Sequence, residues 1–186
     1  MTKSIVISGP PAVGKTTVAK GLAKEFNFQY LSGGDVLKEM AKEQGFNSDG
    51  DDWWDTEEGM KFLNQREQNS EFDQNLDKKL TDLFNQGGMV ITSYTLPWLI
   101  QDGVKIWLEG SHESSTQRMQ SRDNMSSENA FQITKARFDK NKALYKKLYG
   151  FNFGDDKAVF DVIINTDNLT ANQVIDVTTE TVRKLL

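Results

Sequence analysis

The stretch GPPAVGKTT, residues 9–17, decides how this sequence folds and what it binds. It matches the pattern G-x-x-x-x-G-K-[ST] at all four defined positions, Gly9, Gly14, Lys15 and Thr16. The glycines let the backbone turn tightly, so that successive N–H groups point inward at phosphate oxygens. A short apolar run precedes the loop and an amphipathic helical pattern follows it, which is the context such a loop requires. The sequence therefore predicts a binding site for a nucleoside triphosphate.

The residues of this loop have distinct expected roles toward Mg-ATP. Lys15 is expected to reach the β- and γ-phosphates, and the Thr16 hydroxyl to ligate Mg²⁺. The helix that begins near Lys15 adds the positive end of its dipole. The residues expected to hold the ATP phosphates are Gly9, Pro10, Pro11, Ala12, Val13, Gly14, Lys15, Thr16 and Thr17.

The composition excludes several other kinds of protein. A length of 186 residues with 37% hydrophobic residues suits one globular domain, and a formal charge of −5 argues against a general nucleic-acid binder. The chain has no cysteine and one histidine, which argues against disulfides and against thiolate or histidine metal sites. We expect that histidine, His112, to be exposed at a helix start.

The cellular location is an expectation from what the sequence lacks. No apolar run approaches the roughly 20 residues of a membrane helix, and the first residues show no signal-peptide pattern. We therefore expect a cytoplasmic protein with a small-molecule nucleotide substrate and with no nucleic-acid or membrane partner. The sequence does not indicate the oligomeric state, and a monomer is the default expectation.

Short apolar runs alternate with helical patterns along the chain. The runs lack clean alternation, as is typical of a parallel sheet covered on both faces. Helical patterns occupy residues 16–26, 35–45 and 169–186, with Thr170 as a cap for the last. This alternation predicts an α/β fold with a parallel five-stranded sheet flanked by helices. The five expected strands lie within residues 3–9, 28–35, 88–94, 104–110 and 159–165.

Two polar helical stretches, residues 46–86 and 112–150, do not fit the alternation. We interpret them as excursions from one domain spanning residues 1–186. In the first, Trp53 and Trp54 either stack on a base or pack the excursion against the sheet, and the packing interpretation is favoured.

Phosphoryl transfer to a small acceptor fits the chain better than a switch or a motor. A GTPase normally carries N-K-x-D on a later strand, and the chain lacks it. A motor ATPase usually has an acidic residue after a hydrophobic strand, where this chain has Thr92 and Ser93.

The motif SGGDVLK, which begins at Ser32, resembles the loop after the second strand of nucleoside monophosphate kinases. The resemblance implies that the backbone of Ser32, Gly33 and Gly34 approaches the acceptor nucleotide. It also implies that Asp35 faces the metal through water and that Lys38 contacts the acceptor phosphate. The alternative for Asp35 is a plain helix cap.

Residues 118–142 are expected to form a mobile lid, whereas residues 33–86 are expected to bind the acceptor. In these kinases the lid closes over the transferring phosphate and excludes water. We expect Arg118, Arg122 and Arg137 to stabilise the charge that develops on that group. The lysines nearby are expected to be surface residues, and the alternative for the whole stretch is a solvated helix face.

The resemblance extends over most of the chain and is to the archaeal type of cytidylate kinase. It rests on SGPPAVGKTT, SGGDVLKEMAKEQG, EFDQNLDKKL, KIWLEG and KKLYGFNFGDDKAVFDVIINTDNLT. It implies a P-loop kinase fold, transfer of the γ-phosphate of Mg-ATP to CMP or dCMP, and a place near the adenine for Thr166.

One departure from that family leaves the acceptor open. After the third strand the family usually carries an acidic residue, Gly and Arg, whereas this chain has Thr92, Ser93 and Tyr94. Tyr94 can donate a hydrogen bond to the acceptor but carries no charge, and Arg66 is a candidate to compensate. A kinase for AMP or another small metabolite, and a sensor that binds ATP without transferring phosphate, remain alternatives.

Overall fold

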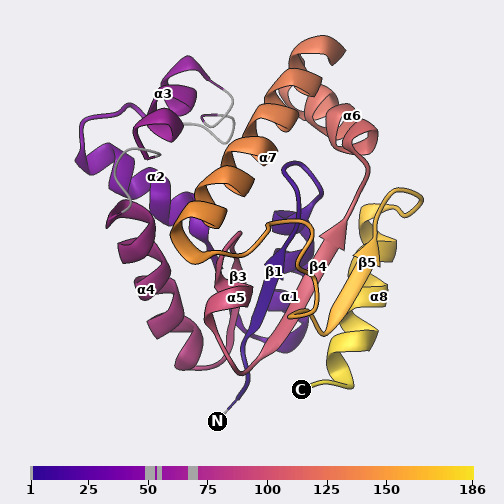
Figure 1. Cartoon of the computed structure of the whole chain (residues 1–186). Coiled ribbons are helices and arrows are strands. Elements are labelled where there is room, and N and C mark those ends of the chain that lie inside the picture. The colour runs from indigo at the N-terminus through magenta and orange to yellow at the C-terminus, as the bar shows by residue number, and fades with distance from the viewer. Residues whose placement is uncertain (1, 49–52, 54–55, 67–70) are drawn as a thin grey trace.

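A parallel sheet forms the centre of the molecule (Figure 1). The computed structural model describes residues 2–48, 53, 56–66 and 71–186. Every pair of neighbouring strands is parallel, in the order β2-β3-β1-β4-β5. The predicted α/β fold with a parallel five-stranded sheet is thus confirmed. The strands are β1 (Ile5–Ser8), β2 (Gln29–Ser32), β3 (Met89–Thr92), β4 (Val104–Glu109) and β5 (Val162–Asn165).

Helices connect and cover the strands. Thr170 caps the last helix with a capping box that includes Gln173, as predicted. The second helix begins at Gly33, earlier than the predicted start near Asp35, because the Ser32 hydroxyl accepts the Asp35 N–H and serves as the N-cap. The helices are α1 (Lys15–Phe26), α2 (Gly33–Glu43), α3 (Glu57–Arg66), α4 (Glu71–Asn85), α5 (Leu96–Leu99), α6 (His112–Asp123), α7 (Ser127–Tyr149) and α8 (Ala171–Arg183).

Each face of the sheet has its own hydrophobic core. Successive side chains of a strand point to opposite faces, and β1 shows this directly. Ile5 and Ile7 pack with residues of α1 and α8, whereas Val6 packs with residues of α2 and α4. Both faces are apolar and covered, so β1 reads as a continuous apolar run and not as an alternating one.

The first polar excursion is held by a buried aromatic cluster. Trp53 is 2% exposed and belongs to the same core as Phe62 of α3, at 5.5 Å between ring centroids. The packing interpretation is therefore confirmed for Trp53, whose buried ring is not available to stack on a base. Trp54 lies outside the described residues.

The second excursion is a helical hairpin that extends beyond the sheet, on the same side as the loop between β1 and α1 (Figure 1). Its helices α6 and α7 are separated at Asn124, which has a φ of 50°. The expectation that His112 is exposed was wrong. Its ring is partly buried, stacks on Phe131 at 4.1 Å, and places Nε2 2.7 Å from the Thr134 hydroxyl, because the start of α6 packs against α7.

In the ranges that the structure describes, no helix is both long and apolar enough to cross a membrane.

The buried position of Trp53 yields a stability prediction. We expect Trp53→Ala to lower the free energy of unfolding by about 3–5 kcal/mol, because it leaves a large cavity beside Phe62. Lys61→Ala, at an exposed position of α3, is the control and is expected to change the free energy of unfolding by less than about 0.5 kcal/mol. Urea unfolding followed by circular dichroism measures both. Equal midpoints for Trp53→Ala and the parent chain would contradict this packing role.

Candidate functional site

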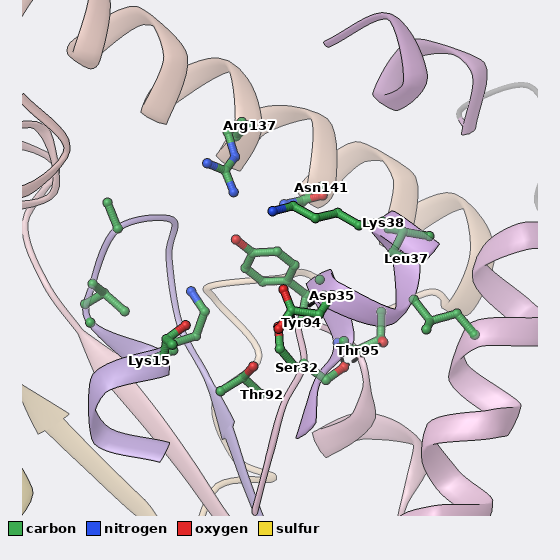
Figure 2. A pocket seen from close by; sticks show the side chains of 18 of the residues that line it. Lys15, Ser32, Asp35, Leu37, Lys38, Thr92, Tyr94, Thr95, Arg137 and Asn141 are labelled. Atoms are coloured by element: carbon green, nitrogen blue, oxygen red, sulfur yellow. Dashed lines mark hydrogen bonds between the residues drawn. The ribbon is translucent and has the colours of Figure 1, made fainter. Parts of the chain in front are cut away.

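A cavity of about 500 Å³ lies at the carboxyl ends of β1, β2 and β3. Its walls come from the glycine-rich loop, α2, α4, the segment after β3, and helices α6 and α7, which contain the expected lid (Figure 2). Gly9, Pro10, Pro11 and Thr166 are not among its lining residues. Of the residues singled out in the sequence, the cavity wall contains Ala12, Val13, Gly14, Lys15, Thr16, Thr17, Ser32, Gly33, Gly34, Asp35, Lys38, Tyr94, Arg118, Arg122 and Arg137.

The glycines of the loop occupy positions that other residues do not fit. Gly9 has a φ of 147°, and a Cβ there would lie 2.3 Å from the carbonyl oxygen of Leu108. Gly14, with a φ of 97°, precedes the first turn of α1 in the left-handed region. The loop therefore turns directly from a buried strand into a helix whose N-terminus faces the cavity, as anion binding requires.

Lys15 is partly buried at the base of the cavity. Its Nζ donates hydrogen bonds to the carbonyl oxygens of Gly9 at 2.9 Å and Pro10 at 2.6 Å, and lies 4.7 Å from the ring centroid of Tyr94. Burial lowers the pKa of Lys15, Tyr94 acts in the opposite direction through its charge and a hydrogen bond, and the positive charge of Arg137 lowers it further. Phosphate oxygens arriving here would stabilise the ammonium form.

Two side chains on the cavity wall carry oxygen atoms suited to a magnesium ion that is bound together with phosphates. Mg²⁺ keeps several waters and usually takes one or two protein oxygens plus substrate phosphates. Thr16 and Asp35 both line the cavity and fit that pattern. Within the described ranges, no group of three or more His, Cys, Asp or Glu side chains is placed to hold a metal ion alone.

The start of α2, directly after β2, lies close to the end of β3. Ser32, not Asp35, caps α2, so the interpretation of Asp35 as a plain helix cap is wrong. A Cβ on Gly33 would lie 3.0 Å from the carbonyl oxygen of Thr92 and 3.2 Å from Leu80. The small residue therefore lets the start of α2 lie directly against the end of β3.

The three lid arginines have different surroundings. Arg137 of α7 extends into the cavity above Tyr94 (Figure 2). Arg118 of α6 donates from Nη2 to the carbonyl oxygen of Thr166 at 2.8 Å, and its Nη1 is buried without a hydrogen-bond partner. Arg122 pairs with its neighbour Asp123. Arg118 thus joins α6 to the loop that follows β5.

Thr166 is fixed by the end of β4. It is 2% exposed, and its hydroxyl and N–H both donate to the carbonyl oxygen of Glu109, at 3.0 Å and 2.8 Å. Next to it, Asp167 accepts the N–H of Ser111, and this bond holds the pKa of the Asp167 carboxyl below its usual value. Thr166 is linked to the cavity only through its carbonyl oxygen, which accepts from Arg118, a lining residue.

The segment Thr92-Ser93-Tyr94 turns from the sheet into α5. The Ser93 N–H donates to the carbonyl oxygen of Ile7 at 3.1 Å, and its hydroxyl accepts the N–H groups of Thr95 and Leu96. The Tyr94 ring packs edge-on against Phe153 at 5.4 Å between centroids. Its hydroxyl points into the cavity, toward Arg137 and Lys38 (Figure 2).

Sequence reasoning missed a buried polar group on the far wall of the cavity. Asp77 of α4 is 4% exposed and accepts hydrogen bonds from the Thr95 hydroxyl and, at 2.6 Å, from the Tyr149 hydroxyl. It thereby connects α4, α5 and α7. The available signal was Asp73 and Asp77, four residues apart on the helix face that also buries Leu76 and Leu80. The missed lining residues are Lys20, Tyr30, Leu37, Asp73, Leu76, Asp77, Thr95, Asn141 and Tyr145.

Arg66 is a candidate to compensate for the missing arginine. It ends α3, and its side chain lies outside what the structure describes.

The lysines of residues 118–142 were expected at the surface. Lys135 and Lys142 pair there with Asp139 and Asp155.

Comparison with known proteins places this geometry among kinases. A model of the cytidylate kinase-like family matches residues 4–168. The cytidylate kinase of Sulfurisphaera tokodaii is 30% identical over 173 residues, which cover 91% of this chain and 89% of that protein. The cytidylate kinase of Methanocaldococcus jannaschii is 28% identical over 186 residues, which cover 97% of this chain and 98% of that protein.

Solved structures share the fold at lower identity. An uncharacterized protein from Eubacterium ventriosum aligns with a TM-score of 0.63 and 19% identity, covering 98% of this chain and 99% of that one. A shikimate kinase from Acinetobacter baumannii aligns with a TM-score of 0.60 and 17% identity, covering 99% of this chain and 94% of that one. At these identities the likeness concerns the fold alone, and it agrees with the predicted P-loop kinase architecture.

The lowered pKa of Lys15 yields a pH prediction. At a pH above that pKa, Lys15 of the protein without ATP is neutral. Bound phosphates favour the charged ammonium form, so ATP binding at such a pH must be accompanied by uptake of a proton. We therefore expect affinity for a non-hydrolysable ATP analogue to fall as pH rises, beginning below the ordinary lysine value of 10.5. Titration calorimetry in buffers of different ionisation enthalpy measures both the affinity and the proton uptake.

The matched variant is Lys15→Arg, because a guanidinium stays protonated over this range. Its affinity is expected to be lower but independent of pH, with circular dichroism confirming that both proteins stay folded. A parent-chain affinity that stays constant up to pH 10.5 would contradict the lowered pKa.

Proposed function

This chain belongs to the cytidylate kinase-like family, and from that premise we propose that it is a nucleoside monophosphate kinase that transfers the γ-phosphate of Mg-ATP to CMP or dCMP. The observation that carries the proposal is a single cavity. It brings the phosphate loop, the segment from Ser32 to Lys38, and the lid arginines around one space. Donor and acceptor held in that space need no covalent intermediate, because positioning and charge stabilisation carry phosphoryl transfer.

The donor half of the cavity is proposed to hold Mg-ATP. The backbone N–H groups from Ala12 to Thr17 and the Lys15 ammonium would contact the phosphates, and Thr16 would ligate Mg²⁺. Pro10 and Pro11 have no N–H to donate and would only shape the turn. Asp35 would hold a water of the ion. The adenine is proposed to lie beside Thr166. The Thr166 carbonyl oxygen accepts a hydrogen bond from Arg118 Nη2, and Arg118 Nη1 is buried without a hydrogen-bond partner.

The acceptor half is proposed to lie between α2, α4 and α7. The backbone of Ser32, Gly33 and Gly34 would approach the monophosphate, and Lys38 would contact its phosphate. Tyr94 would donate a hydrogen bond from the position where related sequences carry an arginine. Arg66 stays a candidate for the missing charge, on the strength of its place at the end of α3.

The lid is proposed to supply the charge that the transition state needs. Arg137 extends over the space between Lys15 and Lys38, where the transferring group would pass (Figure 2). Arg122 is proposed to join it when the lid closes, exchanging its partner Asp123 for phosphate oxygens. An arginine suits this place because its planar fork bonds two phosphate oxygens at once.

One observation favours a second candidate, a kinase of the same fold for another small acceptor. Asp73 and Asp77, 2% and 4% exposed, line the cavity opposite a tyrosine instead of an arginine. Carboxylates suit the hydroxyl and amino groups of a substrate better than its phosphate. A small metabolite rich in hydroxyl groups is therefore the alternative acceptor that these carboxylates favour, and AMP stays an alternative because of the missing arginine alone.

An acceptor panel tests the proposal. We expect Mg-ATP to convert CMP and dCMP to their diphosphates faster than AMP, UMP or GMP, measured by chromatography of the products. Lys15→Ala is expected to lower the rate by about 10²–10³-fold, since one preorganised charge contact is lost. Lys24→Ala, on the exposed face of α1, is the matched control and should leave the rate unchanged.

Two results would contradict the proposal in different ways. Conversion of AMP alone, or of a hydroxyl metabolite alone, would replace the acceptor and keep the kinase. Tight ATP binding with no acceptor-dependent ADP release from any panel member would instead favour a nucleotide sensor.

A further inference from the structure

Tyr94 stands at the point where the two halves of the cavity meet. It follows β3, whose neighbour β1 leads directly into the phosphate loop. The Ser93 N–H bonds the carbonyl oxygen of Ile7, the residue before Ser8 at the end of β1. The sheet itself therefore fixes Tyr94 beside the loop.

The Tyr94 side chain contacts the lysine that is expected to touch the β- and γ-phosphates. Lys15 Nζ lies 4.7 Å from the ring centroid, and Tyr94 partly offsets the lowering of the Lys15 pKa that burial causes. Since a P-loop lysine reaches the γ-phosphate of a bound triphosphate, a hydroxyl in contact with that lysine lies next to the transferable group.

Packing holds the ring while leaving its hydroxyl end in the cavity. The ring meets Phe153 edge-on at 5.4 Å and Tyr145 at 6.4 Å between centroids. Figure 2 shows the phenolic oxygen directed toward the side of the cavity that carries Arg137 and Lys38. With Lys15 on the other side, the oxygen has cationic groups around it that would stabilise charge developing on an incoming phosphoryl group.

Neighbouring hydroxyl groups of the same wall are occupied with holding the fold. Ser32 accepts the N–H of Asp35 and Ser93 accepts those of Thr95 and Leu96. The Thr95 hydroxyl donates to the buried carboxylate of Asp77. The Tyr94 side chain, by contrast, combines contact with Lys15 and access to the cavity.

We infer that Tyr94 is a site of self-phosphorylation, in which its phenolic oxygen takes the γ-phosphoryl group of ATP when no acceptor is bound. The inference rests on the ATP binding in the proposed function. A bond forms between the phenolic oxygen and the γ-phosphorus, and the bond from that phosphorus to the β–γ bridging oxygen breaks. ADP leaves with that electron pair, and the phenolic proton is lost to solvent.

The product would occupy the acceptor's place. An aryl phosphate on Tyr94 carries close to two negative charges at neutral pH and would pair with Lys38 and Arg137. Those are the groups proposed to hold the acceptor phosphate and the transferring group. Acceptor binding and Tyr94 phosphorylation therefore exclude one another, and the modification lowers acceptor turnover in chains incubated with ATP alone.

Mass spectrometry of the full chain tests the inference. After incubation with Mg-ATP alone, we expect one added phosphoryl group per chain, mapped by peptide fragmentation to Tyr94. Lys15→Ala and Tyr94→Phe should show none, the latter with its ring packing retained. Tyr145→Phe, which removes another phenol from the same cavity, is the matched control and should still be labelled on Tyr94.

Two further readouts separate an intramolecular reaction from a contaminating kinase. The labelled fraction at a given time should not change with protein concentration, and saturating CMP should suppress labelling. No phosphotyrosine, a phosphate on another residue, or labelling of Lys15→Ala would overturn the inference. If the same preparation converts CMP to CDP yet stays unlabelled, the self-phosphorylation fails while the proposed function stands.

Discussion

The parallel register of β1 with its neighbours is the constraint on which the site depends. Ile7 pairs with Thr92 of β3, and Ser8 pairs with Trp107 of β4. Because the carboxyl ends of parallel strands meet at one edge of a sheet, the phosphate loop, the Ser32 loop and the Tyr94 segment emerge side by side. The apolar residues of β1 that secure this register are buried on both faces, so the geometry of the site is set by the core.

Electrostatics then divides the cavity by function. Lys15 lies partly buried against the loop's own carbonyl oxygens, which hold its ammonium in the place where phosphates are expected. Arg137 and Lys38 continue the positive charge toward the acceptor side. On the far wall, Asp77 is satisfied by two hydroxyl groups and connects three helices. That buried polar connection ties α4 to the end of α7 and to the start of α5.

Much of this arrangement could be predicted from local patterns. The strands, the phosphate loop and the Thr170 cap each depend on residues close together in the sequence. One error arose where two helices meet: His112 is partly covered because α6 folds back on α7. The other was local: Ser32, the last residue of β2, caps α2 in place of Asp35 because the strand leads directly into the helix. The Asp77 connection links residues 72 positions apart in the case of Tyr149, which no local pattern signals. Tyr94 was noticed as a departure from a family pattern, but its contact with Lys15 needed the sheet to bring the two loops together.

The central claim is that one cavity holds a nucleoside triphosphate and a cytidine nucleotide at the same time. A bisubstrate analogue that joins adenosine and cytidine through a polyphosphate chain tests it most directly, by calorimetry with Mg²⁺. The account predicts that the analogue binds at least about 10²-fold more tightly than a non-hydrolysable ATP analogue, because both halves of the site are occupied without a second loss of freedom. An affinity equal to that of the ATP analogue alone would mean that the acceptor half does not bind cytidine, and would contradict the claim.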